Sequence, residues 1–168
     1  SSLTSVDVPE SVATIGEDAF YGIDTIFYAG KASGTPWGAS KVIRGVRDGY
    51  FLYADSTKSC IVGYLGSDSV VVIPNSVTAI GANAFNSYAK LTTIEIPNSV
   101  TAIGSGAFYG CSSLTSIDVP NSVTGIGDSA FYKCKGLNLL NIPESVATIG
   151  KNAFYGIDTI FYAGKASG

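Results

Sequence analysis

The stretch from Leu91 to Leu137, LTTIEIPNSVTAIGSGAFYGCSSLTSIDVPNSVTGIGDSAFYKCKGL, contains one 23-residue unit written twice in succession. Prolines recur at this spacing at four positions, Pro74, Pro97, Pro120 and Pro143. Phenylalanines recur in the same way, at Phe85, Phe108, Phe131 and Phe154. A fixed period of roughly 20 to 50 residues is the signature of a solenoid, in which each unit forms one coil that packs against its neighbours.

Each unit has the pattern Leu-x-x-Ile-x-Ile-Pro, followed after a short gap by Gly-x-x-Ala-Phe. The Ile or Val residues that alternate before the proline predict a short parallel strand with one face in the core. The proline ends the strand because it has no amide to donate to the ladder. The Gly-x-x-Ala-Phe segment predicts a short helical or 3₁₀ turn at the opposite edge. The predicted fold is therefore a mostly β, right-handed solenoid of the leucine-rich repeat kind, with one parallel strand in each 23-residue coil.

The repeat divides the chain into three segments. Residues 1–30 are predicted to be the end of a preceding array, because a full unit at 3–20 is followed by a shortened strand at 24–30 that ends in glycine rather than proline. Residues 70–168 resume the array and finish in a shortened closing strand. Residues 31–69 separate the two arrays and do not follow the repeat.

The separating segment begins with a Gly/Ser/Pro-rich connector that contains Trp37, the single tryptophan of the chain. After it, apolar residues alternate with the period of strands, and Asp48-Gly49 is a strong signal for a two-residue hairpin turn. We therefore predict a small three-stranded antiparallel β meander at about residues 41–64. Such a meander must bury one face, and the connector with Trp37 is the nearest candidate to cover it.

A second, longer repeat links the two arrays. Residues 7–34 and 141–168 are identical except at four pairs of positions, Asp7/Asn141, Val8/Ile142, Glu17/Lys151 and Asp18/Asn152. The chain also starts at Ser1 and contains no methionine. We therefore expect it to be a piece of a longer protein that repeats this module in tandem.

Composition excludes several function classes. The chain has 46% hydrophobic and 14% charged residues, and its net charge of -3 provides no basic surface for nucleic acid or anionic membrane. The longest aliphatic run, Val70 to Ile73, is too short to span a bilayer. The absence of histidine removes the usual general base and metal ligand, and Cys60, Cys111 and Cys134 form no Cys-x-x-Cys pair. We therefore predict no enzyme activity, no metal and no cofactor.

Cys111 and Cys134 occupy the same position in consecutive units. Stacked coils would place them about 5 Å apart, a distance that permits a disulfide. The alternative is a buried slot for a small apolar side chain, with Ala89 as its occupant in the preceding unit. We expect the second arrangement, with both thiols reduced.

The pattern Ile-Pro-Asn-Ser-Val-Thr-x-Ile-Gly-x-x-Ala-Phe-x-x-Cys at residues 96–111, repeated with Val119 as its first residue at 119–134, resembles the BspA-type leucine-rich repeat of bacterial surface proteins. The segments at 34–39 and 48–53 are similar to the spacers between arrays in that family. The resemblance implies a secreted or cell-surface location and, for some members, adhesion to host proteins or other bacteria. It supplies no catalytic residues.

Alternation within the strands predicts an exposed face with two columns of side chains. One column holds Val70, Thr93, Ser116 and Leu139, and the other holds Val72, Glu95, Asp118 and Asn141. Solenoids use such extended sheets to bind proteins, and a surface that is both apolar and acidic is typical of an interface. We therefore predict that a protein or peptide, from a host or bacterial surface, binds across these eight residues.

Two alternatives compete with this prediction. In the first, the face is solvated strand surface and the module is a structural spacer in a tandem surface protein. In the second, exposed aromatic residues bind carbohydrate, with Trp37, Phe27 and Phe161 as candidates. A catalytic pair formed by Glu95 and Asp118 is disfavoured, because an open face keeps both carboxylates solvated.

Overall fold

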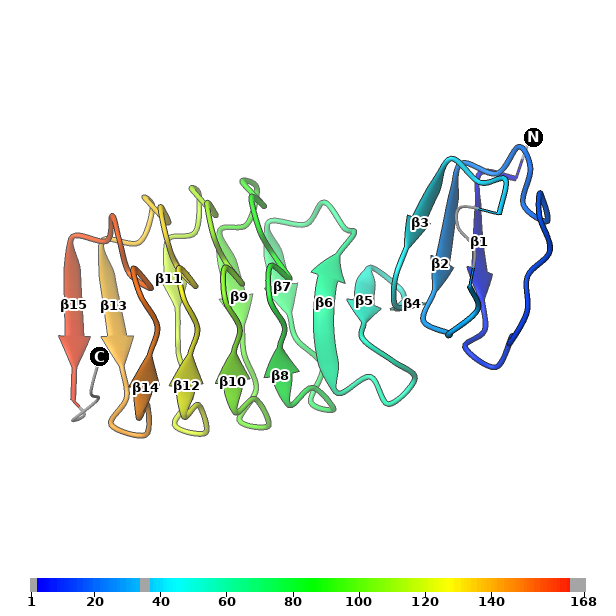
Figure 1. Cartoon of the computed structure of the whole chain (residues 1–168). Helices are drawn as coiled ribbons and strands as arrows, with labels where there is room; N and C mark the ends of the chain where they lie inside the picture. The colour runs from blue at the N-terminus through cyan, green and yellow to red at the C-terminus, as the bar shows by residue number, and fades with distance from the viewer. Residues whose placement is uncertain (1–2, 34–36, 164–168) are drawn as a thin grey trace.

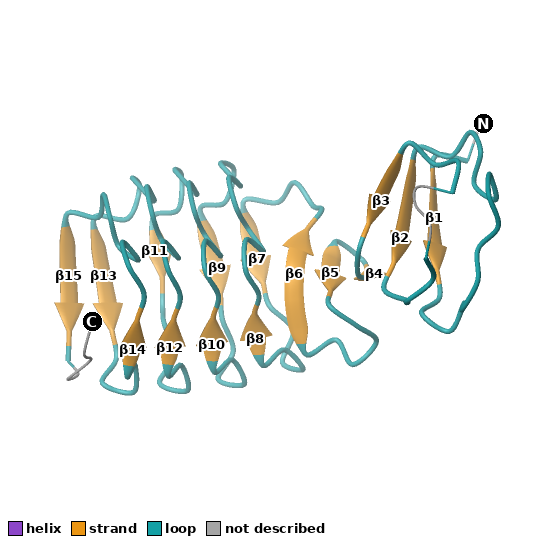
Figure 2. Ribbon diagram, viewed as in Figure 1, coloured by secondary structure: helices purple, strands orange, loops and turns teal. Residues whose placement is uncertain are grey.

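The repeat period produces a stack of coils in the computed structural model, which describes residues 3–33 and 37–163. In Figure 1 the coils follow one another in a row, with β1 (Ser5–Val8), β2 (Thr25–Tyr28) and β3 (Lys41–Ile43) at one end and β15 (Thr159–Tyr162) at the other. Figure 2 shows strands joined by turns and loops, and no helix in the described part of the chain. The predicted β-solenoid fold is confirmed.

The strand predicted before each proline is present throughout the second array. These strands are β7 (Val70–Val72), β9 (Thr93–Glu95), β11 (Ser116–Ile117) and β13 (Leu139–Ile142), followed by the closing strand β15. They pair in parallel, in the order β11-β9-β7 in one sheet and β13-β15 in another. Partners in the first sheet lie one repeat unit apart, as in Val70↔Thr93 and Thr93↔Ser116. The sequence period thus becomes the strand register.

Each coil also has a second short strand, which goes beyond the prediction of one strand per coil. These strands are β8 (Ala79–Ile80), β10 (Ala102–Ile103), β12 (Gly125–Ile126) and β14 (Thr148–Ile149). Their isoleucines pair in parallel from coil to coil, and the strands belong to a seven-stranded sheet of order β14-β12-β10-β8-β6-β5-β4. A strand of two residues is too short to show alternation, so periodicity could not reveal it.

The Gly-x-x-Ala-Phe segment forms isolated turns instead of a continuous helix. In the coil of Phe108, the amide of Ala107 donates to the carbonyl of Gly104 at 3.2 Å, three residues back, as in a 3₁₀ turn. The amide of Phe108 instead donates to Ala130 of the next coil at 2.8 Å. Gly106, which lies between Gly104 and Ala107 in the chain, has φ +61°, a left-handed conformation that interrupts a right-handed helix. The turn edge is therefore a ladder between coils as well as a series of turns.

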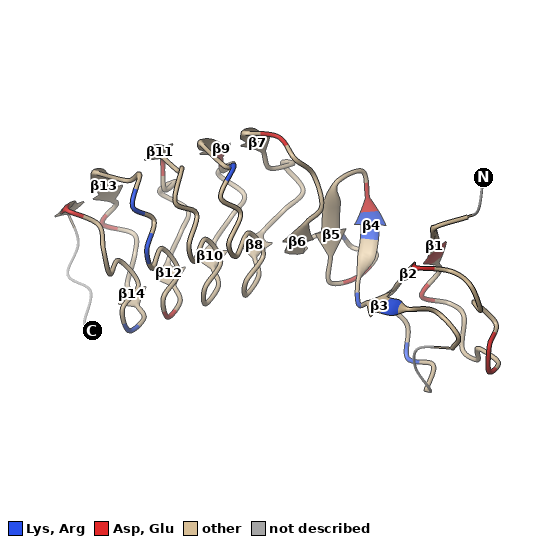
Figure 3. Cartoon of the chain, turned by 90° about the horizontal axis from the view of Figure 1, so that it is seen from above, with Lys and Arg blue, Asp and Glu red and all other residues tan. Residues whose placement is uncertain are grey.

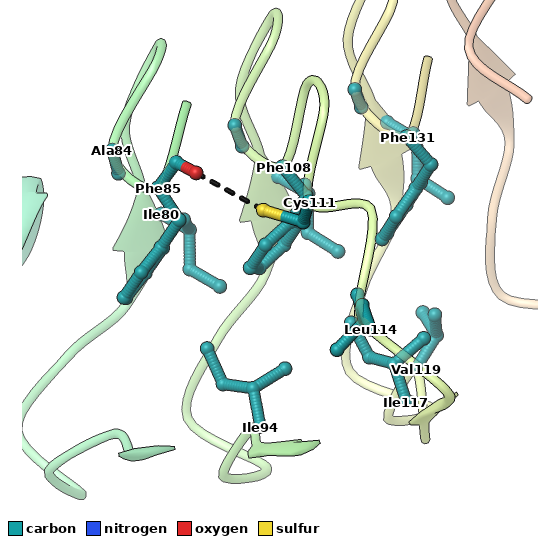
Figure 4. Packing of buried hydrophobic residues seen from close by; sticks show 14 of the residues in the cluster. Ile80, Ala84, Phe85, Ile94, Phe108, Cys111, Leu114, Ile117, Val119 and Phe131 are labelled. Carbon is teal, nitrogen blue, oxygen red and sulfur yellow. Dashed lines mark hydrogen bonds between the residues drawn. The ribbon is translucent and has the colours of Figure 1, made fainter. Parts of the chain in front are cut away.

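The predicted spine of phenylalanines fills the core of the second array (Figure 4). Phe85, Phe108 and Phe131 are buried, and their rings stack with centroids 5.4 and 5.2 Å apart. Leu91, Leu114 and Leu137 are also buried, in the same cluster. The stack continues to Phe154, 5.9 Å beyond Phe131 and half-buried. Each coil therefore depends on the next one to complete the environment of its ring.

Cys111 and Cys134 are free, fully buried thiols. Their Sγ atoms donate to the carbonyls of Phe85 and Phe108 at 3.1 and 3.0 Å (the first is drawn in Figure 4). Burial raises the pKa of each thiol to about 12. The residue at this place in the preceding coil is Tyr88, because the amide of Leu91 donates to Tyr88 just as the amide of Leu114 donates to Cys111. The expected place of Ala89 in this column is therefore wrong.

The antiparallel meander consists of β4 (Val46–Asp48), β5 (Phe51–Tyr53) and β6 (Cys60–Tyr64). It starts later than residue 41, since β3 pairs in parallel with β2 and belongs to the sheet of the first array. On its other side, β6 pairs in parallel with β8, through Ile61↔Ile80. Figure 1 shows the consequence: the meander continues the sheet of the second array and covers its first coil.

Trp37 does not cover the meander, which corrects the sequence expectation. It is buried in a separate cluster with Ile26, Tyr28, Ala32 and Ala39, inside the first array. Its ring meets the Tyr28 ring edge-on at a centroid distance of 5.7 Å. The meander instead packs its buried face, including Tyr53 and Ile61, against the core of the second array. Parallel pairing of β3 with β2 holds residues 37–43 against the first array, and the meander packs on the second.

Candidate strand-face binding site

The eight side chains predicted to face outward lie on one side of the second array, on and beside strands β7, β9, β11 and β13. In Figure 3, seen from above, these strands run along one side of the row of coils, and β8, β10, β12 and β14 run along the other. Seven of the eight residues are exposed and Thr93 is half-buried. Three of the exposed residues are large and apolar: Val70, Val72 and Leu139, with exposed fractions of 52%, 58% and 49%.

Strand register aligns these residues into the two predicted columns. Val70 is opposite Thr93, and Thr93 is opposite Ser116, with their hydroxyl oxygens 3.5 Å apart. In the second column, Val72 is opposite Glu95. This pairing puts an apolar side chain directly beside a carboxylate, as the sequence predicts. The backbone ladder is interrupted between β11 and β13, which belong to different sheets.

Phe161 extends the second column, although sequence reasoning did not place it there. It is opposite Asn141 in the β13–β15 pair and is 61% exposed. This pairing spans 20 residues instead of 23, because the closing coil is shorter. The 23-residue period therefore passes over Phe161, and the signal that could have found it is the recurrence of Asp-Thr-Ile-Phe-Tyr-Ala-Gly at 24–30 and 158–164.

Two shallow hollows accompany the second column. One, of about 310 Å³, lies between Glu95 and Asp118 on neighbouring coils. The other, of about 460 Å³, is lined by Asp118, Asn141 and Phe161 together with the chain that follows β13 and β15. The face therefore offers an acidic hollow next to one with an aromatic wall.

Among residues 3–33 and 37–163, no basic side chain forms an ion pair with either carboxylate of the face. The described part of the chain contains two ion pairs, Arg47–Asp7 and Lys58–Asp48, and both lie outside the face. Like charges on neighbouring strands weaken a sheet, so Glu95 and Asp118 do not contribute favourably to stability through each other. Their position is better explained by solvent or by a partner than by folding.

The aromatic residues considered for carbohydrate binding do not form an exposed group. Trp37 and Phe27, two candidates of the carbohydrate-binding alternative, are buried, with exposed fractions of 5% and 7%, so neither ring is available to a sugar on the surface. The guanidinium of Arg47 covers Phe27 at 4.9 Å from the ring centroid, and that of Arg44 lies 5.6 Å from the Trp37 ring. Of the three candidates, only Phe161 is exposed.

A stack of tyrosines on the turn edge is an aromatic feature that the sequence analysis missed. Tyr109, Tyr132 and Tyr155 belong to three consecutive coils, and their rings stack with centroids 5.0 and 4.8 Å apart. The Phe-Tyr dipeptide in each of these coils is the signal that could have predicted it. Tyr132, in the middle, and Tyr109, at one end, are half-buried, while Tyr155 is exposed at the other end of the stack.

Within residues 3–33 and 37–163, no group of three or more His, Cys, Asp or Glu side chains is placed to hold a metal ion. The same residues form no helix that is long and apolar enough to cross a membrane.

Comparison with known proteins supports the repeat pattern independently. The sequence model of the family described as "BspA type Leucine rich repeat region" matches six copies, over residues 1–28 and 66–162. Comparison with curated protein sequences finds no match.

Several solved structures have a similar fold. A leucine-rich repeat protein from Bacteroides capillosus ATCC 29799 is 27% identical, with a TM-score of 0.62, over 71% of this chain and 98% of that one. The T. pallidum leucine-rich repeat protein TpLRR is 25% identical, with a TM-score of 0.57, over 70% of this chain and 71% of that one. A leucine rich cell surface protein from Faecalibacterium prausnitzii A2-165 is 22% identical, with a TM-score of 0.55, over 97% of this chain and 60% of that one.

Proposed function

The chain belongs to the family of BspA-type leucine-rich repeat proteins, and from that membership we propose that it is a non-enzymatic binding module that holds a protein or peptide on its strand face. The observation that carries the proposal is an acidic and apolar surface on neighbouring strands, whose carboxylates form no ion pair with another described residue. Val72 beside Glu95 gives a protein partner both a desolvated contact and a charge to match.

The complementary partner carries apolar and basic groups. Glu95 and Asp118 attract Lys or Arg side chains, while Val70, Val72 and Leu139 provide apolar contacts around them. Charge complementarity of this kind accelerates association and weakens as salt screens it. Binding should therefore fall with rising ionic strength but persist in part at high salt, through the apolar contacts.

An extracellular or cell-surface location is part of the proposal. It is supported by the resemblance of the repeats in this chain to the BspA-type repeats of bacterial surface proteins, and by the description of one similar structure as a leucine rich cell surface protein. In that location the partner would be a protein of a host or of another bacterium.

The test reverses the charge of the face and compares it with the same change elsewhere. Peptides are selected from a random display library on the unaltered chain, and their affinity is then measured for Glu95→Lys combined with Asp118→Lys. The matched control combines Glu17→Lys with Asp24→Lys, two exposed residues of the first array. Adhesion of the same variants to host cells and candidate host proteins is measured in parallel.

The expected result is selection of peptides with basic and apolar residues, and an affinity loss of about tenfold or more for the face variant, which corresponds to about 1.4 kcal/mol. The control should bind as the unaltered chain does. If the face variant binds equally well in both assays, the strand face is not the site. In that case the alternative, a structural spacer with a solvated face, is the better account.

A further inference from the structure

The tetrapeptide Thr-Ile-Phe-Tyr occurs twice in the chain, as β2 and as β15, with very different exposure. In β2, Ile26 and Phe27 have exposed fractions of 0% and 7%. In β15, Ile160 and Phe161 have exposed fractions of 39% and 61%. Each strand pairs in parallel with the strand one coil before it, β1 or β13, in the same register. The difference must come from what lies on the other side of each strand.

On that side of β2, the chain continues as a strand and a buried indole. β3 pairs in parallel with β2, so that Ile26 is opposite Val42, and Trp37 and Ala39 fill the interior below. The carbonyl of Trp37 accepts the amide of Phe20 at 2.9 Å, as Ala130 accepts the amide of Phe108 in the regular array. The segment from Trp37 to Ile43 thus takes the place of a following coil.

A close backbone contact fixes this arrangement. Gly38 has φ +84°, and a Cβ at this residue would be 2.8 Å from the Cα of Asp18 and 2.9 Å from the backbone nitrogen of Tyr21. No side chain fits at that distance, so the connector can approach the turn only with glycine at this position. On the outer face, Arg47 covers the Phe27 ring and forms an ion pair with Asp7 at 2.6 Å.

The second copy has the same receiving surface. The amide of Tyr155 donates to Asn152 at 3.2 Å, as Tyr21 donates to Asp18 at 3.0 Å. The hydroxyl of Tyr162 donates to Val146, as that of Tyr28 donates to Val12. The turns that meet Gly38 and Trp37 in the first copy are therefore formed in the second copy as well.

A cavity marks the place that Trp37 fills in the first copy. It has a volume of about 770 Å³ and is lined by Ile149, Phe154, Ile160 and Tyr162, with Lys151 to Ala153 at its turn edge. The counterparts of the first four are Ile15, Phe20, Ile26 and Tyr28, which all pack in the Trp37 cluster. Among the described residues, β15 pairs with β13 alone, so its other edge is open.

We propose that this cavity and the open edge of β15 form a docking site for a further copy of the segment from Trp37 to Arg47, supplied in tandem by another module of the same kind. The indole enters the cavity, the segment equivalent to β3 adds to β15 as a parallel strand, and the arginine equivalent to Arg47 covers Phe161. Tandem supply is favoured because residues 163–168 repeat the sequence of 29–34, which leads from β2 to the Trp37 segment in the first copy.

The other candidate occupant is a second molecule. An open strand edge can pair with the same edge of another chain, which would give an antiparallel β15–β15 dimer. That dimer would leave the cavity without an indole. The two occupants therefore differ in both stoichiometry and contacts, and one set of experiments separates them.

The test lengthens the chain after Gly168 with a second copy of residues 35–47 and follows hydrogen exchange of the amides of Phe154 and residues 159–162. The control carries the same added residues in scrambled order. A third chain has the added copy with the Trp37→Ala change made in that copy only. The native-order extension should slow exchange at these amides by about tenfold or more relative to the scrambled one, because the strand edge and the cavity become covered. The Trp37→Ala extension should lose most of that protection.

Equal exchange in the native-order and scrambled chains would overturn the proposal, as would full protection by the Trp37→Ala extension. Sedimentation of the unextended chain provides the other arm. A monomer supports tandem docking, whereas a concentration-dependent dimer that Ile160→Asp abolishes would show that a second molecule covers this edge.

Discussion

Residues 7–29 and 141–163 share almost all of their sequence and the same turns, yet the first copy is closed and the second is open at its last strand. The closed copy buries Ile26 beneath β3 and Trp37, while Ile160 in the open copy borders a cavity. Exposure of a residue in a solenoid thus depends on the neighbouring coil as much as on the residue itself. The shared sequence forms the same local turns in both copies, but the burial of its side chains depends on the segment that packs against the last strand.

The two ends of the second array show the same dependence. At its beginning, β6 pairs with β8 and buries Ile61 completely, so the meander covers the first coil. At its end, the ring of Phe154 is half-buried although its counterpart Phe131 is fully buried. Covering elements are therefore part of the fold, because an uncovered coil exposes the apolar interior of the solenoid.

The strongest way to break the closed copy is to remove the indole that fills it. We expect Trp37→Ala to reduce the free energy of unfolding of the first array by about 3 to 5 kcal/mol, through the cavity and the lost contacts to Tyr28 and Ala39. Hydrogen exchange should accelerate in β1, β2 and β3, and it should stay unchanged in the coil of Phe108, which contacts only its own neighbours. Equal acceleration along the whole chain would contradict independent closure of the first array.

Two isoleucines at equivalent positions show how much the covering segment contributes to the free energy of unfolding. Ile26→Ala should destabilise the protein by about 2 to 5 kcal/mol, since the side chain is completely buried. Ile160→Ala, in the same tetrapeptide, should cost about 1 kcal/mol or less because its side chain is partly in water. Both are measured by denaturant unfolding with local exchange as a second probe. Similar losses at the two positions would mean that β15 is as well covered as β2.

The sequence predicted the strand that precedes the proline of each repeat unit, but not the second, two-residue strand of each coil. Periodic prolines and isoleucines placed the strands that precede the prolines. Asp48-Gly49 predicted the hairpin between β4 and β5, although its two-residue loop is Gly49-Tyr50, because Asp48 pairs with Phe51. The sequence did not reveal that Lys41–Ile43 belongs to the first array, since these three residues carry neither the proline nor the leucine of the repeat. Nor could composition show where Trp37 packs, because the connector has no period and its burial comes from long-range contacts.

Alternation predicted which side chains of the strand face point outward, but not how far the second column extends. Strict period-two alternation fixed which side of β7, β9 and β13 faces out, and these side chains do face out. It could not show that the Thr93 and Ser116 hydroxyls lie within 3.5 Å of each other. It also missed Phe161, whose position depends on the shorter closing coil.

The smallest expected effect concerns the one position on the outer face where the two copies differ in charge, Asp7 and Asn141. In the closed copy, Nε and Nη2 of Arg47 donate to the two carboxylate oxygens of Asp7 at 3.0 and 2.6 Å, and this hydrogen bonding raises the pKa of Arg47. The two side chains are 36% and 51% exposed, so solvent screens the pair. Asp7→Asn converts the closed copy to the sequence of the open one at this position and should cost about 1 kcal/mol or less.

Its control is the reverse change, Asn141→Asp, in the open copy. Among the described residues, no arginine pairs with residue 141 as Arg47 pairs with Asp7. This variant should gain nothing and should lose slightly, because the new carboxylate lies one coil from Asp118. Both free energies of unfolding are measured at low salt and at 1 M salt, where the loss from Asp7→Asn should shrink as the ion pair is screened. If Asn141→Asp stabilises the protein by as much as Asp7→Asn destabilises it, the carboxylate stabilises its own strand in both copies. The cover that Arg47 forms over Phe27 would then not depend on the ion pair between Arg47 and Asp7.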